Sequence, residues 1–336
     1  IYDYRFEWDD KNKLSRTIDS NGGILTTYYN DHGLPIKEID PEGGETHYEY
    51  NEQGLLSKSI DPMGATNEYQ YNELCLITQQ TDALGNTQVI DYNDDGQPTQ
   101  ITDADSNTWL RDYDERGLLR QITDPLGNQT RYQYNHYGQP ALITNALGQT
   151  TQLLWSPQGE LIAEKDTEGQ TTHYQYNRSG QLQRTQQGNE HSTEYQYDVM
   201  GHITRIILPN GQSRHFTYNA SGQLTQYIDE AGRNTQYQYD GLSQVRRRID
   251  PMGQPLTYFY DKERNLTGLQ NEKGETYQLH YDKNERLISE IGFDGRQQHY
   301  VYNPSGHVIE QIDGQKEGSS SEQESQQNFN VMRWGS

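Results

Sequence analysis

The fold is decided by residues 46–64, which read THYEYNEQGLLSKSIDPMG. Tyr48 and Tyr50 alternate with polar residues, which is the period-two pattern of a β-strand that presents both rings on one face. Asn51 and Gly54 follow and favour a tight reversal, because both residue types tolerate turn backbone. A second alternating run comes next and ends in the turn sequence DPMG. One unit is therefore strand, turn, strand, turn.

The second aromatic ring of this unit recurs every 21 residues without insertion. Fifteen units are present, and such a fixed period indicates a repeat architecture. The rings are Trp8, Tyr29, Tyr50, Tyr71, Tyr92, Tyr113, Tyr134, Trp155, Tyr176, Tyr197, Tyr218, Tyr239, Tyr260, Tyr281 and Tyr302. We take as structural markers of the repeat Tyr48, Tyr50, Asn51, Gly54, Asp61, Gly64, Tyr132, Tyr134, Gly138, Tyr237, Tyr239, Asp250 and Gly253.

Two regions differ in composition. The repeat array occupies residues 1–313, and residues 314–336 form a Ser/Gln/Glu-rich segment that we expect to be a flexible tail. In this tail, Phe329, Met332 and Trp334 either dock on the end of the array or belong to a following region.

Composition narrows the classes of protein that the chain can belong to. Only 30% of its residues are hydrophobic, and the mean hydropathy is −1.12, too polar for a thick core. The 27 tyrosines nevertheless supply large rings that a sheet can bury. A net charge of −22 opposes binding to nucleic acid or to anionic membranes. No apolar run is long enough for a transmembrane helix, so we expect no membrane insertion.

Two strands in each of fifteen units make about thirty strands. Open sheets of more than roughly ten strands curl, because each strand twists against the next. Turns at both ends of both strands favour an antiparallel meander over a parallel solenoid. Wound into one circular turn, thirty strands would form a ring roughly 45 Å across. We therefore predict an all-β fold, a continuous sheet of hairpins that spirals into part of a hollow shell.

The pattern Tyr-x-Tyr-(Asn/Asp)-x-x-Gly-x-(Leu/Ile), followed by (Ile/Thr)-Asp-x-x-Gly, resembles the tyrosine–aspartate (YD) repeats of the rearrangement-hotspot (Rhs) family. Similar repeats occur in the B–C components of insecticidal toxin complexes and in teneurins. The resemblance covers residues 1–313 and implies a spiralling sheet that closes into a hollow β-shell. Bacterial members of the family are polymorphic toxins whose shell encloses a C-terminal toxic domain, often for export by type VI secretion.

The resemblance implies a structural, non-catalytic segment of such a shell, in a secreted bacterial effector. Its partners would be the C-terminal toxin domain or the remaining shell of the parent polypeptide, and also secretion-spike proteins. Because the chain starts inside the first strand of a unit, we expect it to be part of a longer polypeptide that carries the targeting elements.

Self-cleavage is the one catalytic property that the resemblance raises. Family shells end in an autoproteolytic Asp-Pro-x-Gly-Leu segment, whereas here no Asp-Pro-x-Gly copy is followed by Leu, and every copy lies in phase with the repeat. We therefore expect ordinary turns at these places. The four copies begin at Asp40, Asp61, Asp124 and Asp250.

Aspartate recurs eleven residues past the ring in ten units and could suggest Ca²⁺ binding. No unit clusters the oxygen ligands of a calcium loop, so we expect each Asp to accept backbone N–H groups in its own turn. The ten are Asp19, Asp40, Asp61, Asp82, Asp103, Asp124, Asp166, Asp229, Asp250 and Asp313.

Other reactive residues give no site. The ten His show no His-x-x-x-His pairing, the single Cys75 takes a turn-glycine position, and no nucleophile–base pair is evident. The basic run 246–248 is a salt-bridge site, a contact for acidic cargo or, as we favour, solvated charge. We predict no catalytic residue, no cofactor and no metal.

The tyrosine ladder leaves one alternative function open. Stacked rings can bind sugar faces, as in repeats of similar length that bind glucans or choline. Those repeats depend on Trp and on adjacent aromatic pairs, whereas this chain has only four Trp. A cell-surface carbohydrate-binding or adhesion module is therefore the alternative to a shell segment.

Overall fold

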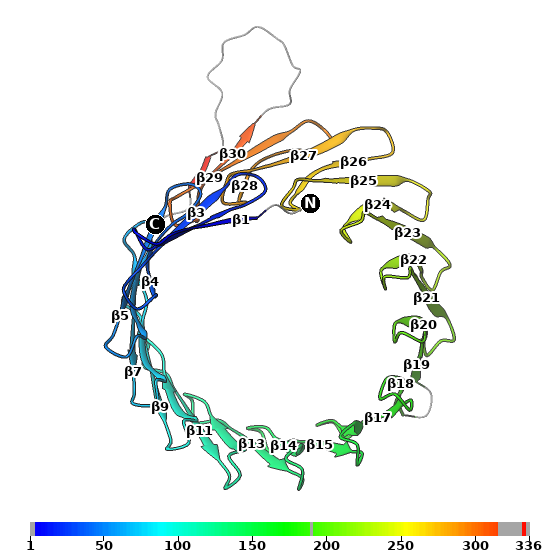
Figure 1. Ribbon diagram of the computed structural model, residues 1–336. Coiled ribbons are helices and arrows are strands. Elements are labelled where there is room, and N and C mark those ends of the chain that lie inside the picture. The colour runs from blue at the N-terminus through cyan, green and yellow to red at the C-terminus, as the bar shows by residue number, and fades with distance from the viewer. Residues whose placement is uncertain (1–3, 189–190, 315–330, 334–336) are drawn as a thin grey trace.

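The computed structural model describes residues 4–188, 191–314 and 331–333, the last of these as backbone (Figure 1). The described residues form strands joined by tight turns. The first ten strands are β1 (Arg5–Asp9), β2 (Leu14–Ile18), β3 (Ile24–Tyr29), β4 (Pro35–Ile39), β5 (Glu45–Tyr50), β6 (Leu56–Ile60), β7 (Thr66–Tyr71), β8 (Ile77–Thr81), β9 (Thr87–Tyr92) and β10 (Pro98–Thr102). The next ten are β11 (Thr108–Tyr113), β12 (Leu119–Thr123), β13 (Gln129–Tyr134), β14 (Pro140–Thr144), β15 (Thr150–Trp155), β16 (Leu161–Lys165), β17 (Thr171–Tyr176), β18 (Leu182–Gln187), β19 (His191–Tyr197) and β20 (Ile203–Ile207). The last are β21 (Ser213–Tyr218), β22 (Leu224–Ile228), β23 (Asn234–Tyr239), β24 (Val245–Ile249), β25 (Pro255–Tyr260), β26 (Leu266–Gln270), β27 (Thr276–Tyr281), β28 (Leu287–Ile291), β29 (Gln297–Tyr302), β30 (Val308–Gly314) and β31 (Val331–Arg333).

Each strand pairs antiparallel with its neighbour in sequence, from β1–β2 to β30–β31, so the sheet is one unclosed meander. The all-β prediction is confirmed. Within a repeat the pairing register shifts by one residue beside the ring: Tyr71 lies opposite Ile77, but Gln70 lies opposite Gln79. This bulge follows from the turn, in which Cys75 (φ 60°) takes the left-handed position that Gly occupies in most repeats.

Each repeat has a first turn, which follows the ring, and a second turn, which ends the unit. In the first turn 51–55, Asn51 Oδ1 accepts the amides of Gln53 (3.0 Å) and Leu55 (2.9 Å). In the second turn 61–65, Asp61 Oδ1 accepts the amides of Met63 (2.9 Å) and Ala65 (2.7 Å). The aspartate thus satisfies its own turn, as the sequence indicates.

The second ring of each repeat joins that repeat to the one before it. The inter-repeat ladder between β6 and β7 pairs only 58–60 with 66–68, so it leaves the carbonyl of Leu56 without a backbone partner. Tyr71 Oη donates to that oxygen at 2.7 Å. The same bond, from ring to the residue fifteen positions earlier, recurs at 2.6–2.9 Å for Tyr50, Tyr71, Tyr92, Tyr113, Tyr134, Trp155, Tyr176, Tyr197, Tyr218, Tyr239, Tyr260, Tyr281 and Tyr302.

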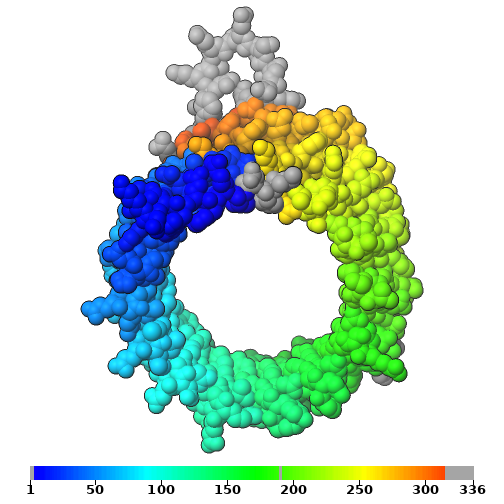
Figure 2. All heavy atoms as spheres, in the orientation of Figure 1, coloured from blue at the N-terminus to red at the C-terminus, as the bar shows by residue number. Residues whose placement is uncertain are grey.

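The wall is one sheet thick, and its centre is open (Figure 2). The chain exposes 22491 Å² of surface, against about 14,000 Å² for a compact monomer of this size. Within the described residues, no large side chain is fully buried. The sheet therefore has no second layer to pack against, and its stability depends on ladders, turns and rings.

The sheet winds past its own start, so β1 and β3 lie beside β27–β30 in the ring (Figure 1). Asn21 contacts Asp261, 240 residues later, and a Cβ on Gly23 would meet the carbonyl of Lys283, 260 residues later. The mean of 250 residues, divided by the 21-residue unit, gives about 12 repeats or 24 strands per coil. At the usual strand spacing this is a ring about 37 Å across, narrower than the roughly 45 Å of a single circular turn, because the thirty strands wind through more than one coil.

The last repeat departs from the pattern. Asp313, expected in a turn, lies in β30 opposite Gln298. Lys316 stands at the position that Gly takes in most second turns, and Ser106 fills the same position of turn 103–107 with φ 66°. Most of the expected tail 314–336 lies outside the described residues, and its division from the array stays a prediction. Phe329 and Trp334 also lie outside them, whereas β31 pairs with β30.

Loss of one ring hydroxyl should weaken the sheet locally. Tyr134→Phe removes the 2.7 Å bond to the carbonyl of Leu119, so we expect the free energy of unfolding to fall by about 1 kcal/mol in urea titrations. Tyr137→Phe is the matched control, because this side chain is 67% exposed. Equal effects of the two changes would contradict the role of the ring.

Glycine in the second turn should matter through its backbone conformation. Gly127 has φ +84°, so Gly127→Ala should cost about 1 kcal/mol and speed proteolytic nicking at this turn. Gly241 lies in a first turn without positive φ, and nothing crowds a Cβ there, so Gly241→Ala should be neutral or slightly stabilising. Urea unfolding and limited proteolysis give both comparisons; a neutral Gly127→Ala would show the turn assignment to be wrong.

Candidate functional site: the hollow wall and the overlap of its coils

The structure gives the two predicted tyrosines of a repeat different roles. Tyr50, Tyr134 and Tyr239 donate to backbone carbonyls of the preceding repeat. The first ring instead spreads over the sheet: Tyr48 Oη donates to Glu38 at 2.7 Å. Tyr132 and Tyr237 are likewise half-buried on β13 and β23.

The predicted turn residues all lie in turns. Asp250 Oδ1 accepts the amides of Met252 (2.9 Å) and Gln254 (2.8 Å), in the manner of Asp61. Gly54, Gly64, Gly138 and Gly253 all have φ between 78° and 84°. None of these residues converges with the others on a single site, because each serves its own repeat.

The two faces of the wall differ in character. On β13, Tyr132 and Tyr134 are half-buried, whereas the alternating Arg131 and Gln133 are exposed. On this strand, one face thus carries the rings and the other carries exposed polar side chains; at the same positions of other strands, that second face also exposes Leu110, Leu154 and Phe259. The hydroxyl edges of these tyrosine rings point into the wall, where they form hydrogen bonds.

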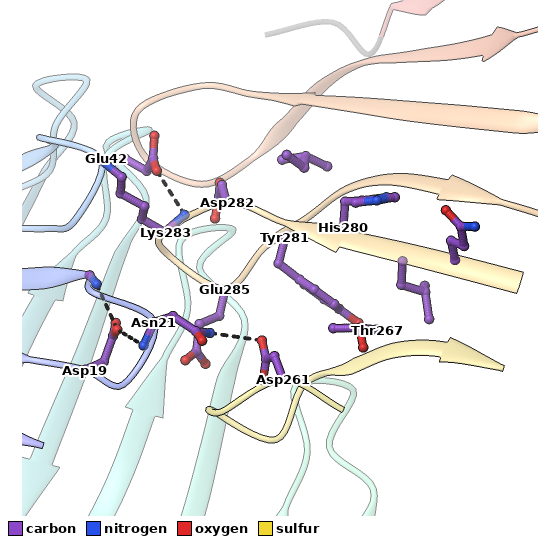
Figure 3. Close-up of a pocket in the computed structure, with 14 residues that line it drawn as sticks. Asp19, Asn21, Glu42, Asp261, Thr267, His280, Tyr281, Asp282, Lys283 and Glu285 are labelled. Carbon is purple, nitrogen blue, oxygen red and sulfur yellow. Dashed lines mark hydrogen bonds between the residues drawn. The ribbon is translucent and has the colours of Figure 1, made fainter. Parts of the chain in front are cut away.

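The two ends of the spiral meet at an overlap, where second turns of the first coil contact first turns of the second coil (Figure 3). Asn21 Nδ2 donates to Asp261 Oδ2 at 2.9 Å, and the Lys283 amide donates to Glu42 Oε1 at 2.9 Å. Glu263 accepts the hydroxyl of Tyr4 at 2.9 Å and also the amide of Ser20. A groove of about 780 Å³ runs along these loops.

Burial in the described side chains is concentrated at this overlap. Leu14, Ser15 and Thr27 are buried in the first coil, and Glu263 in the second. Gly23 and Gly268 are buried as well. Glu263 and Gly23 lie in the contacts between the coils, whereas a Cβ on Gly268 would meet Tyr277 and Phe259 of its own coil. Outside 14–27 and 263–268, the described wall is half-buried at most.

The overlap is rich in carboxylates. Desolvation raises the pKa of Glu263, but hydrogen bonds from Ser20 and Tyr4 outweigh this, so the pKa is lowered. The hydrogen bond to Glu263 is the main cause that raises the pKa of Tyr4 to about 12. Glu285 projects toward Asn21 and Asp19 (Figure 3), and partial desolvation together with Glu263 and Asp19 raises its pKa.

Other candidate chemistry stays dispersed. Among the described residues, no group of three or more His, Cys, Asp or Glu is placed to hold a metal ion. That part of the chain also has no helix long and apolar enough to cross a membrane. Cys75 is exposed in its turn, and Arg246, Arg247 and Arg248 are exposed on β24.

The sequence analysis did not identify the overlap residues Glu263, Asn21, Gly23 and Gly44. A signal was present: the position fifteen past the ring is Gly in the first two repeats but long and polar in most others. Without the curvature of the sheet, nothing tells which repeats meet.

Ionisation of Glu285 should weaken the overlap. Since its pKa is raised in the folded state, the closed overlap favours the protonated form; the cost appears as pH rises above the range of an ordinary glutamate and is absent below it. Besides Glu263 and Asp19, the groups around it are Asp261, Asn265, Lys283 and Arg286.

We therefore expect Glu285→Gln to slow amide exchange in loops 19–23 and 282–286 at pH 7.5 and to change nothing near pH 4. Glu52→Gln, in an exposed first turn away from the overlap, is the control. Hydrogen exchange read by mass spectrometry at both pH values provides the measurement. An effect of Glu285→Gln that is the same at both pH values would contradict this assignment.

Comparison with known proteins points to one family. Residues 3–137 and 128–319 match the teneurin YD-shell family. No curated protein matches the chain.

Solved structures show the same fold. The crystal structure of TcdB2-TccC3 without its hypervariable C-terminal region matches 98% of this chain with a TM-score of 0.81 and 16% identity, and 21% of that chain is covered. TcdB2-TccC3-TEV matches 92% of this chain with a TM-score of 0.69 and 14% identity, again over 21% of its own length. This chain thus spans about a fifth of those proteins. The family match over most of its length, on an antiparallel wall of tyrosine repeats, shows that the chain belongs to the teneurin YD-shell family.

Proposed function

We propose that the chain is a structural, non-catalytic segment of a β-shell that encloses a toxin polypeptide for delivery. The observation that carries the proposal is the hollow: a wall one sheet thick curves through more than a full turn around an open centre (Figure 2). In a wall of this kind, the residues enclose a space and do not form a packed core.

The chemistry of the wall supports containment over catalysis or glycan binding. The recurrent polar residues Asn51 and Asp61 are occupied by their own turns, and the ring hydroxyl of Tyr71 is occupied by the preceding repeat. Polar groups engaged in this way are not available as hydrogen-bond partners for a substrate or a sugar. The likeness to TcdB2-TccC3 agrees with a toxin-shell role.

The partners follow from this role. We infer that the cargo is a C-terminal toxin domain of the parent polypeptide, and that the rest of the shell continues this wall. The unpaired outer edge of β1 can receive a further strand, because an edge strand presents free N–H and C=O groups. Export as a secreted effector, through a type VI spike or a toxin complex, is the delivery route that we propose.

Containment makes the cargo resistant to protease. In the purified parent polypeptide, we expect cryo-electron microscopy to show density inside the hollow. We also expect trypsin to spare the toxin segment until urea unfolds the shell. The toxin segment expressed alone is the control. An empty hollow, with the toxin segment digested as fast as the control, would overturn the proposal, and selective binding on a glycan array would favour the carbohydrate-binding alternative.

A further inference from the structure

We propose that the overlap is an encoded closure interface, limited to three repeats, that can open while the sheet stays paired. Its docking strip is formed by the second turns 19–23, 40–44 and 61–65 of the first coil. The occupant is this chain's own second coil, through the first turns that begin at Asp261, Asp282 and Asn303. This inference concerns how the ring closes and does not depend on the cargo.

One position of the repeat marks the docking strip. Fifteen residues past the ring, the first three repeats carry small residues, and the other twelve carry long polar or charged ones. The small residues are Gly23, Gly44 and Ala65. The others are Asn86, Asn107, Asn128, Gln149, Gln170, His191, Gln212, Arg233, Gln254, Glu275, Arg296 and Glu317.

The small residues make room for the backbone of the second coil. A Cβ on Gly23 would lie 2.2 Å from the Asp19 carboxylate of its own turn and 3.1 Å from the carbonyl oxygen of Lys283. One on Gly44 would lie 2.6 Å from the Asp40 carboxylate and 3.2 Å from the carbonyl oxygen of Pro304. Both distances to the second coil are tighter than ordinary contacts, so a longer side chain would push the coils apart. Two successive repeats thus meet two successive repeats at the same relative position.

A long residue at this position has a different use elsewhere in the wall. Asn86 Nδ2 donates to Asp82 Oδ2 at 2.9 Å, and Asn128 makes the same bond to Asp124 at 2.8 Å. The side chain therefore completes its own turn. In the docking strip, glycine has no side chain to form this bond, and the space is taken by the backbone of the other coil.

The first two strip turns each lie between two first turns of the second coil. Turn 19–23 contacts Asp261 and Glu263 on one side and the loop of Lys283 on the other. Turn 40–44 is placed in the same way, one repeat further along, between the loops of Lys283 and Pro304. Turn 61–65 lies beside the third occupant: desolvation raises the pKa of Asp61, whereas Ser305 of that occupant, together with the amides of the turn, lowers it.

The second coil loses its regular repeat where the docking strip of the first coil ends. The strict 21-residue period stops after Tyr302. Arg333 of β31 lies opposite Glu310 of β30, just as Glu68 of β7 lies opposite Lys58 of β6, so Arg333 takes the place of Glu68 in the repeat. The period would have placed that residue at 320, so the repeat is delayed by 13 residues. The small residues of the first coil end after the third repeat. The strict period of the second coil ends at the repeat that faces it, so the interface contains three repeats.

The interface can open because no ladder crosses it. All strand pairings among the described residues join neighbours in sequence, whereas the coils are joined by side chains and turn amides. The loss of these few bonds therefore leaves every strand paired. The overlap is the least stable junction of the wall.

The test converts the strip turns to the type found elsewhere in the wall. The double variant Gly23→Asn/Gly44→Asn recreates the sequence of the turn Asp82–Asn86, in which the Asn side chain and the Asp carboxylate fit together, so the carboxylates of Asp19 and Asp40 must shift to that arrangement and the remaining effect comes from the overlap. We expect the amides of Ser20 and Lys283, which donate across the overlap, to exchange about tenfold faster or more. Amides of β12–β14 should be unchanged, and small-angle scattering should show an opened ring.

Asn86→Gly is the matched control, because it removes a side chain from the same turn position outside the strip. Glu263→Ala is the second variant, since it removes the acceptor of Tyr4 and Ser20 without touching a turn glycine. Unchanged exchange at Ser20 and Lys283 in both overlap variants would overturn the proposal. Equal opening by Asn86→Gly, or faster exchange throughout the sheet in both overlap variants, would also overturn it.

Discussion

The wall depends on one hydrogen bond, from the second ring of each repeat to a carbonyl of the repeat before it. The bulge beside Tyr50 shortens the inter-repeat ladder that follows and leaves the carbonyl of Leu56 unpaired. An unpaired buried acceptor is costly, so Tyr71 satisfies it. Trp155 does the same for Pro140 at 2.7 Å, which explains why Trp can replace Tyr at this position. Phenylalanine would fill the space but lack the donor.

Local satisfaction of each repeat permits a sheet without a core. Asn51 and Asp61 hold the two turns, and Tyr50 holds the strand start of the preceding repeat. Since the polar groups of each unit are satisfied within it or by the ring of the next unit, units can be added without a second layer. The same regularity gives every strand the same twist relative to its neighbour, so curvature accumulates evenly until the ring meets its own start.

The sequence predicts the repeat unit well and its long-range consequences less well. Alternation at Tyr48 and Tyr50, and turn residues at Asn51 and Gly54, are local signals, so strands and turns could be predicted. The target of the Tyr50 hydroxyl could not, because it depends on a register shift. The number of strands per coil could not either, because it depends on a small twist summed over 24 strands. In the sequence, Gly23 resembles any other turn glycine. Its contact with Lys283 depends on the curvature of the whole sheet.

The overlap is where these two levels of organisation meet. Along the described sheet, the ring bond recurs in thirteen repeats, and no single repeat decides the fold. Across the coils, the bonds of Glu263, Asn21 and Lys283 occur once each. The wall is built from many contacts that are alike in every repeat and is closed by a few that occur once. A substitution that changes the strength of one contact therefore has its largest effect at the closure. In a container, that is the place where the wall can yield while the repeats themselves stay folded.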